Sequence, residues 1–143
     1  MKRLLLGTIS LLVCIGVQAA QPTLQAQSRP DDARVYILSP ADGATVPRTF
    51  TVRFGLHGMG VAPAGVDRKD TGHHHLLIDV AKLPPAGQPI PADAHHRHFG
   101  GGQTETTLTL TPGTHTLQLE LADSRHVPFA RPLISRRITV HVK

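Results

Sequence analysis

The sequence of 143 residues predicts an all-β fold, an immunoglobulin-like β-sandwich of about seven short strands. Apolar and polar residues alternate in several short runs, which is typical of strands with one buried face. Turns rich in glycine and proline separate these runs, and no segment has the period of an amphipathic helix. The expected strands span residues 34–38, 49–57, 73–80, 104–110, 115–121 and 134–142.

The first three strands are defined by their apolar residues. The first is a short apolar run that ends at the turn 39–43, which contains proline and glycine. In the second, Phe50, Val52 and Phe54 alternate with polar residues, as in a strand with one buried face. The third begins with three consecutive histidines and then continues as an alternating strand.

The second half of the sequence contains a long connection and three more strands. Residues 84–102 include four prolines and have no period, so we expect neither a strand nor a helix there. Long loops without regular structure are often functional. The turn 111–113 resembles the corner between strands E and F of an immunoglobulin-like sandwich, where a ring residue, here His115, bonds back to the backbone. Residues 123–132 are expected to be a loop before the last strand.

The first 19 residues have the pattern of a secretory signal peptide. Two basic residues precede an apolar run that is too short to cross a bilayer, and a small-residue cleavage site ends at Ala19. We therefore expect a periplasmic or secreted protein. The lone cysteine, Cys14, would leave with this peptide, so the mature chain would have no disulfide and no thiolate metal ligand.

The rest of the chain is expected to be one domain. Residues 20–33 are polar and aperiodic, which predicts a disordered lead-in, and residues 34–143 form the single β-sandwich domain. Removing Lys2 and Arg3 with the signal peptide changes the formal charge from +5 to +3, which is too little for a nucleic-acid-binding surface. Aromatic residues make up only 3% of the chain, which argues against surfaces that stack sugars or single strands.

Histidine is the abundant residue of potential function, with 10 in the chain. In the predicted topology, strands 49–57 and 115–121 run toward one end of the sandwich, and strands 73–80 and 104–110 run away from it, because the long connection returns to that end. The start of strand 73–80, the end of the long connection and the loop after strand 115–121 then meet at one end of the sandwich. Each of these segments carries histidines, at 73–75, 95–98 and 126.

This convergence predicts a site for a divalent transition metal. Side chains at i and i+2 of a strand lie on one face, roughly 6.6 Å apart, so two imidazoles can bind one ion. Without cysteine, an all-imidazole site favours Cu(II) over Zn(II) or Ni(II). The protein would then be a metal carrier, buffer or metallochaperone and not an enzyme. The expected ligands are His73, His75, His96, His98 and His126.

Other roles for these residues stay open. His74 points away from its neighbours, so it is either buried beside the core or a ligand, and His115 is either the corner residue or a ligand. The protein could instead be a cell-envelope interaction module without metal, or a small histidine-ligated metalloenzyme. As a module it would bind an envelope protein or an anionic polymer through the loops at the histidine-rich end of the sandwich and through a set of arginines. That set is Arg125, Arg131, Arg136 and Arg137.

Three motifs together resemble a known family. They are Gly-His-His-His-Leu-Leu-Ile-Asp at 72–79, His-Phe-Gly-Gly-Gly-Gln-Thr-Glu at 98–105 and Pro-Gly-Thr-His-Thr-Leu-Gln at 112–118. The chain is similar, over roughly residues 34–142, to the bacterial exported family called domain of unknown function 4399. The resemblance implies a single exported domain and no established activity. The family's histidine pattern corresponds to His73, His74, His75, His96, His98, His115 and His126.

Overall fold

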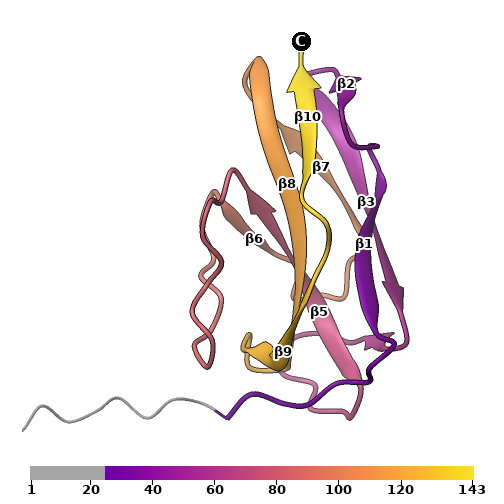
Figure 1. Cartoon of the computed structure of the whole chain (residues 1–143), viewed down its shortest axis with the longest axis vertical. Coiled ribbons are helices and arrows are strands. Elements are labelled where there is room, and N and C mark those ends of the chain that lie inside the picture. Colours follow the sequence, from indigo (N-terminus) through magenta and orange to yellow (C-terminus); the bar gives the residue numbers. More distant parts are fainter. Residues whose placement is uncertain (1–24) are drawn as a thin grey trace, which may run out of the picture.

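The computed structural model describes residues 25–143, so the expected signal peptide, with Ala19 and Cys14, lies outside the described residues (Figure 1). The described residues form ten strands and no helix, which confirms the predicted all-β class. This part of the chain therefore contains no helix that could cross a membrane. The strands are β1 (Arg34–Ser39), β2 (Ala44–Val46), β3 (Thr49–His57), β4 (Gly60–Val61), β5 (Thr71–Ile78), β6 (His96–His98), β7 (Glu105–Thr109), β8 (Gly113–Ala122), β9 (Pro128–Ile134) and β10 (Ile138–Val142).

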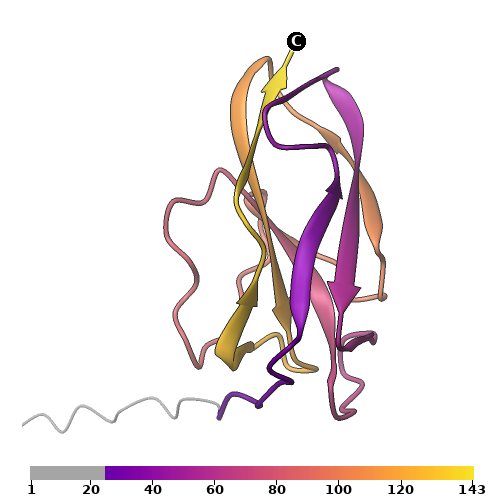
Figure 2. The ribbon, with the colours of Figure 1, turned by 45° about the vertical axis from the view of Figure 1, so that its right-hand side comes forward.

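The strands form two sheets that run along the long axis of the molecule (Figures 1 and 2). The smaller sheet has the order β1-β3-β7 and is antiparallel. The larger has the order β2-β10-β8-β5-β4, with β6 paired to β5 and β9 paired to β8. Its central pairs, β10–β8 and β8–β5, are antiparallel. This is the strand order of an immunoglobulin-like sandwich, whose strands are conventionally lettered from A to G in chain order. In that convention, β2 corresponds to a late segment of strand A, β5 to strand C and β8 to strand F.

The core lies between the two sheets and is built by alternation along each strand. Val52 and Phe54 of β3 point inward from the smaller sheet, and Leu117 and Leu119 of β8 point inward from the larger one. Leu76 of β5 is fully buried beside them. Burying side chains of this size stabilises the fold by about 1.5–3 kcal/mol each, so the alternation fixes which face of every strand points inward.

Two segments differ from the sequence-based expectation. Residues 96–98 lie in the connection expected to contain no strand, but they form β6, because their backbone pairs with the free edge of β5. Residues 128–132, expected to belong to a loop, are part of β9, and the expected last strand, 134–142, is regular only from Ile138, as β10; β9 and β10 pair with different parts of β8. At the break, the Ser135 hydroxyl accepts a hydrogen bond from Leu119 N and donates one to Arg136 O. The loop before β9 is correspondingly shorter than expected and ends at Val127.

Residues 25–33, expected to be a disordered lead-in, contain no strand or helix, yet they contact the sandwich. Ala130 N of β9 donates a hydrogen bond to Gln27 O. The Arg29 guanidinium donates to Arg131 O at 2.7 Å and to Pro132 O at 3.4 Å. Backbone donors and acceptors on β9 therefore hold this segment in place.

His115, at the start of β8, has the corner role expected from the sequence. Its Nδ1 lies 2.7 Å from Asp79 Oδ2, and its Nε2 lies 2.9 Å from Thr111 O. Both partners only accept hydrogen bonds, so the doubly protonated ring satisfies both contacts. The hydrogen bond with Asp79 raises the pKa of His115 above its ordinary value of 6.5, against the opposing effect of partial burial.

This corner predicts a pH-dependent contribution to stability. Because the folded pKa of His115 is raised, the contribution is fully present below the unfolded pKa of 6.5 and is lost as pH rises through the folded pKa. We expect His115→Gln to lower the free energy of unfolding more at about pH 5.5 than at about pH 8.5, measured by chemical denaturation. His141→Gln, at an exposed position paired to the same strand, is the control and should show no such difference. An equal loss at both pH values for His115→Gln would contradict this account.

Candidate metal centre

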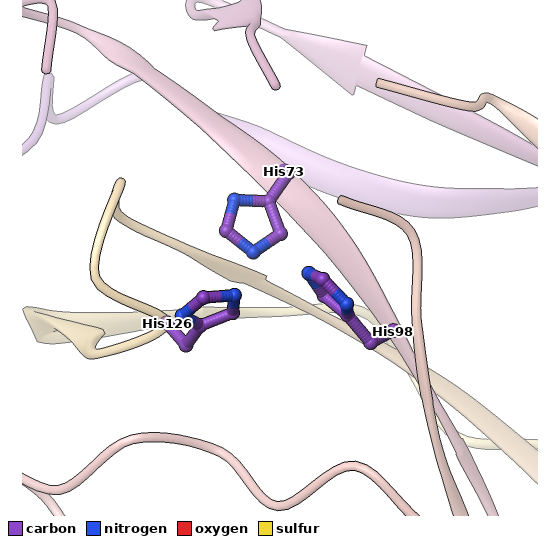
Figure 3. Close-up of side chains that lie close together, drawn as sticks. All are labelled: His73, His98 and His126. Carbon is purple, nitrogen blue, oxygen red and sulfur yellow. The ribbon is translucent and has the colours of Figure 1, made fainter. Parts of the chain in front are cut away.

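Four histidine rings from three separate segments meet on the outward face of the larger sheet. His73 and His75 lie on β5, His98 lies on β6, and His126 lies in the turn between β8 and β9 (Figure 3 shows three of them). The ring centre of His73 is 5.0 Å from the centres of His75, His98 and His126. One ring nitrogen each of His73, His98 and His126 lie within 4.8 Å of one another. The convergence of histidine groups expected from the topology is therefore present.

The pleat of β5 determines which of its histidines reach this cluster. His73 and His75 point to the outward face, whereas His74 and Leu76 point to the core, because side chains alternate along a strand. Loops cover the outward face at this point: Ile90 N of the connection before β6 donates a hydrogen bond to His126 O at 2.8 Å. His73 and His75 are consequently fully buried although they lie outside the main core.

The closest contact in the cluster has the separation that a shared ion requires. Nε2 of His73 and Nε2 of His75 are 3.2 Å apart. With metal–nitrogen bonds of about 2.0–2.1 Å, two ligands at angles of roughly 90–109° have nitrogens about 2.9–3.4 Å apart. As it stands, the contact is a hydrogen bond in which one ring donates and the other accepts. An ion could replace that single proton with little movement of the two rings.

The ring of His98 occupies space that is free only because the residue two positions later is glycine. A Cβ atom added to Gly100 would lie 2.6 Å from His98 Nε2 and 2.3 Å from His98 Cε1. No side chain other than hydrogen fits there while the ring keeps its position. Gly102 has a φ of 79°, a left-handed conformation that turns the chain toward β7. The glycine run thus both turns the chain and leaves space for a histidine of the cluster.

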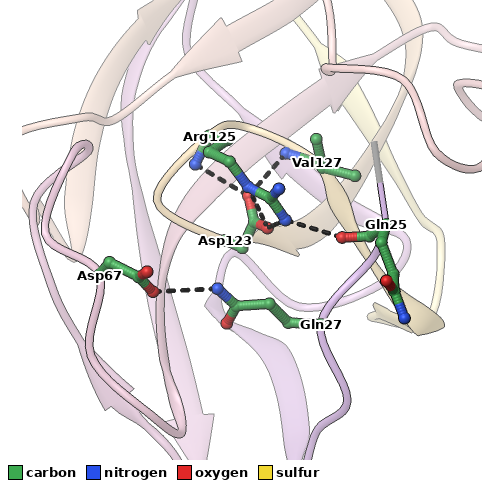
Figure 4. A network of polar contacts seen from close by, with 6 residues as sticks. All are labelled: Gln25, Gln27, Asp67, Asp123, Arg125 and Val127. Atoms are coloured by element: carbon green, nitrogen blue, oxygen red, sulfur yellow. Dashed lines mark hydrogen bonds and ion pairs between the residues drawn. The ribbon is translucent and has the colours of Figure 1, made fainter. Parts of the chain in front are cut away.

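A buried aspartate holds the turn that carries His126 (Figure 4). Asp123 Oδ1 accepts hydrogen bonds from Arg125 N at 2.8 Å and Val127 N at 3.0 Å. Asp123 Oδ2 pairs with the Arg125 guanidinium at 2.8 Å, which compensates the charge of the fully buried carboxylate. His126 N donates to Asp123 O, and His126 has the uncommon φ of 68°. These contacts determine the direction in which the His126 ring leaves the turn.

The environment favours the neutral form of His73, His75 and His98. Burial, followed by the nearby rings of His126 and His98, lowers the pKa of His73 to about 4. Burial and then the same neighbours, with His73, lower the pKa of His75 to about 2. The pKa of His98 is also lowered, first by burial and then by His126. A neutral imidazole has a free lone pair, so the cluster offers nitrogen donors ready to bind a cation.

Of the five histidines expected as ligands, His96 does not join the cluster. Its Nδ1 lies 2.9 Å from Asp93 Oδ1, on a carboxylate that also caps the backbone amides of His95 and His96. Asp93 begins the turn into β6, so this contact fixes the start of that strand. His95 is used similarly, with Nδ1 2.9 Å from Ile78 O.

His74 is buried in the core, one of the two roles left open for it. Its ring packs against Phe54, with ring centres 5.2 Å apart. Neither ring nitrogen has a partner with hydrogen-bond geometry among the described residues. Burial lowers the pKa of His74 to about 4, and a nearby backbone group of Gln103 offsets this only in part.

Three residues at the cluster have roles that the sequence did not indicate: Gly100, Asp123 and Glu120. Glu120 alternates with leucines on β8 and would be read as a solvated residue, but it is 1% exposed. Burial raises the pKa of its carboxyl group to about 7. A polar residue in the middle of a leucine-rich run is the only signal in the sequence, and it does not reveal that loops cover this face.

The turn around Asp123 predicts a large effect on stability. Asp123→Ala removes the acceptors of two backbone amides and leaves Arg125 without its buried partner. A buried donor left without an acceptor costs about 1–3 kcal/mol, whereas the Arg125 guanidinium is exposed enough to turn to solvent, so we expect a loss of about 2 kcal/mol or more in the free energy of unfolding, measured in denaturant. Asp123→Asn retains one amide acceptor and should lose less. A loss below about 1 kcal/mol for Asp123→Ala would contradict this role of the turn.

The comparisons with known proteins identify the family. Residues 52–143, more than half of the chain, match the family model described as Domain of unknown function (DUF4399). Searches of curated proteins and of solved structures found no significant match to the chain. The matched region contains every histidine of the cluster and the glycine and aspartate that hold them. The chain belongs to the DUF4399 family, as its three motifs indicated.

Proposed function

We propose that the protein binds one divalent transition metal ion through His73, His75, His98 and His126, with Cu(II) favoured over Zn(II) and Ni(II). It would serve as a metal carrier, buffer or metallochaperone in the periplasm or outside the cell, where the expected signal peptide would direct it. The observation that carries the proposal is the 3.2 Å contact between the Nε2 atoms of His73 and His75, with two further rings beside it.

The donor set supports this choice of ion. Four imidazoles without thiolates suit Cu(II), Ni(II) and Zn(II), and affinity among divalent ions generally peaks at copper. Four ligands fill a tetrahedral or square-planar shell, which favours holding an ion over activating a bound water. His98 is the exposed member of the cluster, so an ion could enter and leave at this ring.

The alternative as an interaction module has less support. It assigned Arg125, Arg131, Arg136 and Arg137 to binding an envelope protein or anionic polymer, but the first three each face an aspartate of the same chain. Arg125 in particular is committed to the buried Asp123. These internal partners reduce the positive potential available to an anionic ligand.

The central prediction concerns the β5 pair. Changing both His73 and His75 to Ala removes two ligands from the same face and should abolish tight binding of Cu(II), measured by calorimetric titration of the metal-free protein with Cu(II), Zn(II) and Ni(II). Wild type should bind one ion with a Kd well below about 1 μM. The matched control changes His57 and His141, two exposed histidines outside the cluster, and should bind as wild type does. Weak uptake of several ions by wild type, or unchanged affinity in the His73/His75 variant, would overturn the proposal.

A second prediction uses the glycine beside His98. Gly100→Ala forces the His98 ring out of its position, since the new Cβ would overlap the ring. We expect Cu(II) affinity to fall by about tenfold or more, as for other changes that displace a ligand's support. Gly101→Ala is the matched control, because its Cβ would meet only the flexible end of Gln103, at 2.9 Å. Equal affinities of the two variants would show that His98 does not bind the ion.

A further inference from the structure

Glu120 occupies a position directly beside the histidine cluster. On the paired strands β5 and β8, the Cα partner of Glu120 is His75. Directly paired residues of antiparallel strands point to the same face, with Cβ atoms about 4.5–5.5 Å apart. Leu119 and Leu121 on either side point into the core, so Glu120 points to the face that carries His73 and His75. At 1% exposure, its carboxyl group shares the covered space of these rings.

This carboxyl group is not committed to any other contact that would explain its burial. Its Oε2 atom has no hydrogen-bond partner among residues 25–143. The other acidic residues near the cluster are engaged: Asp123 with Arg125 and two backbone amides, and Asp93 with His96. A buried carboxyl group without a partner costs free energy, so its place on this face calls for a function.

The rings opposite Glu120 lack the partner that a carboxylate provides. The Nδ1 atoms of His73 and His75 are both buried and have no hydrogen-bond partner within the described part of the chain. Their Nε2 atoms face each other, so Nε2 is the atom through which each would bind an ion. Nδ1 would then carry the proton, and histidines that bind metals almost always donate this second N–H to a carboxylate, a carbonyl or water.

We infer that Glu120 is a positioning residue of the metal centre, whose carboxylate accepts the Nδ1–H of His75 when Nε2 binds the ion. This inference rests on the proposed function. The hydrogen bond would fix the tautomer and orientation of His75 and make its Nε2 a stronger donor. The carboxylate would also place a negative charge beside a dication that otherwise has only neutral ligands.

Two substitutions at Glu120 in the full chain test the inference. Glu120→Gln keeps the shape and removes the charge, and Glu120→Leu removes both charge and acceptor. We expect Cu(II) affinity to fall in both, by about 10- to 100-fold for Glu120→Leu, with altered Cu(II) hyperfine coupling in electron paramagnetic resonance. In the Zn(II) form, NMR should show a slowly exchanging Nδ1 proton of His75 that Glu120→Leu abolishes.

The matched control is Gln118→Leu, two residues along the same strand and face, where the residue opposite is Leu77. It should leave the copper spectrum and affinity unchanged. The metal-free Glu120→Leu protein should be as stable in denaturant as wild type, because it loses an unpartnered buried group. If both Glu120 variants have the copper spectrum and affinity of the wild type, the role of Glu120 is overturned, but the proposed function is not. A wild-type protein that binds none of the ions would overturn the proposed function and this role with it.

Discussion

The burial of β5 on both faces is the constraint on which the rest of the site depends. Its inward face packs against the smaller sheet, and loops cover its outward face, so three consecutive histidines are removed from water. An ionisable group that is buried must either have a partner for its charge or be in its neutral form. On the core side, His74 stays neutral against Phe54, whereas on the outward side His73 and His75 face each other and the rings of two further segments. The segments around β5 are arranged to meet this requirement.

Histidine side chains occur in three different environments in this molecule, and each environment favours a different state of protonation and hydrogen bonding. His115 lies between two acceptors, a carboxylate and a carbonyl, which favour the charged ring. His73 and His75 lie beside other imidazoles and away from water, which favours the neutral ring with a free lone pair. His74 is neutral because it is buried in the core, where neither ring nitrogen has a hydrogen-bond partner among the described residues. Only the second state offers several donors at one point, which is why the cluster, and not histidine content as such, supports metal binding.

The supporting residues belong to different segments, yet they act on single rings. Gly100 leaves space for His98, Asp123 fixes the turn of His126, and Glu120 lies opposite His75. In the metal-free protein, this arrangement keeps polar atoms buried at a cost in stability. Under the proposed function, an ion that binds only the folded state would stabilise it by an amount that rises with the logarithm of the ratio of free ion concentration to Kd.

The sequence by itself determined the sandwich, its main strands, the corner at His115 and the meeting of three histidine groups, because alternation and turn residues are local signals that fix strand direction. It did not determine that residues 96–98 form β6, since pairing with a free sheet edge depends on the partner strand and not on local propensity. The sequence also did not show that His96, an expected ligand, contacts Asp93 and does not join the cluster, because such a side-chain contact depends on how the connection folds. Only the tertiary structure decided which rings share one point and that Glu120 is buried beside them. Both depend on which loops cover the outward face of β5, and no periodicity in the chain encodes that.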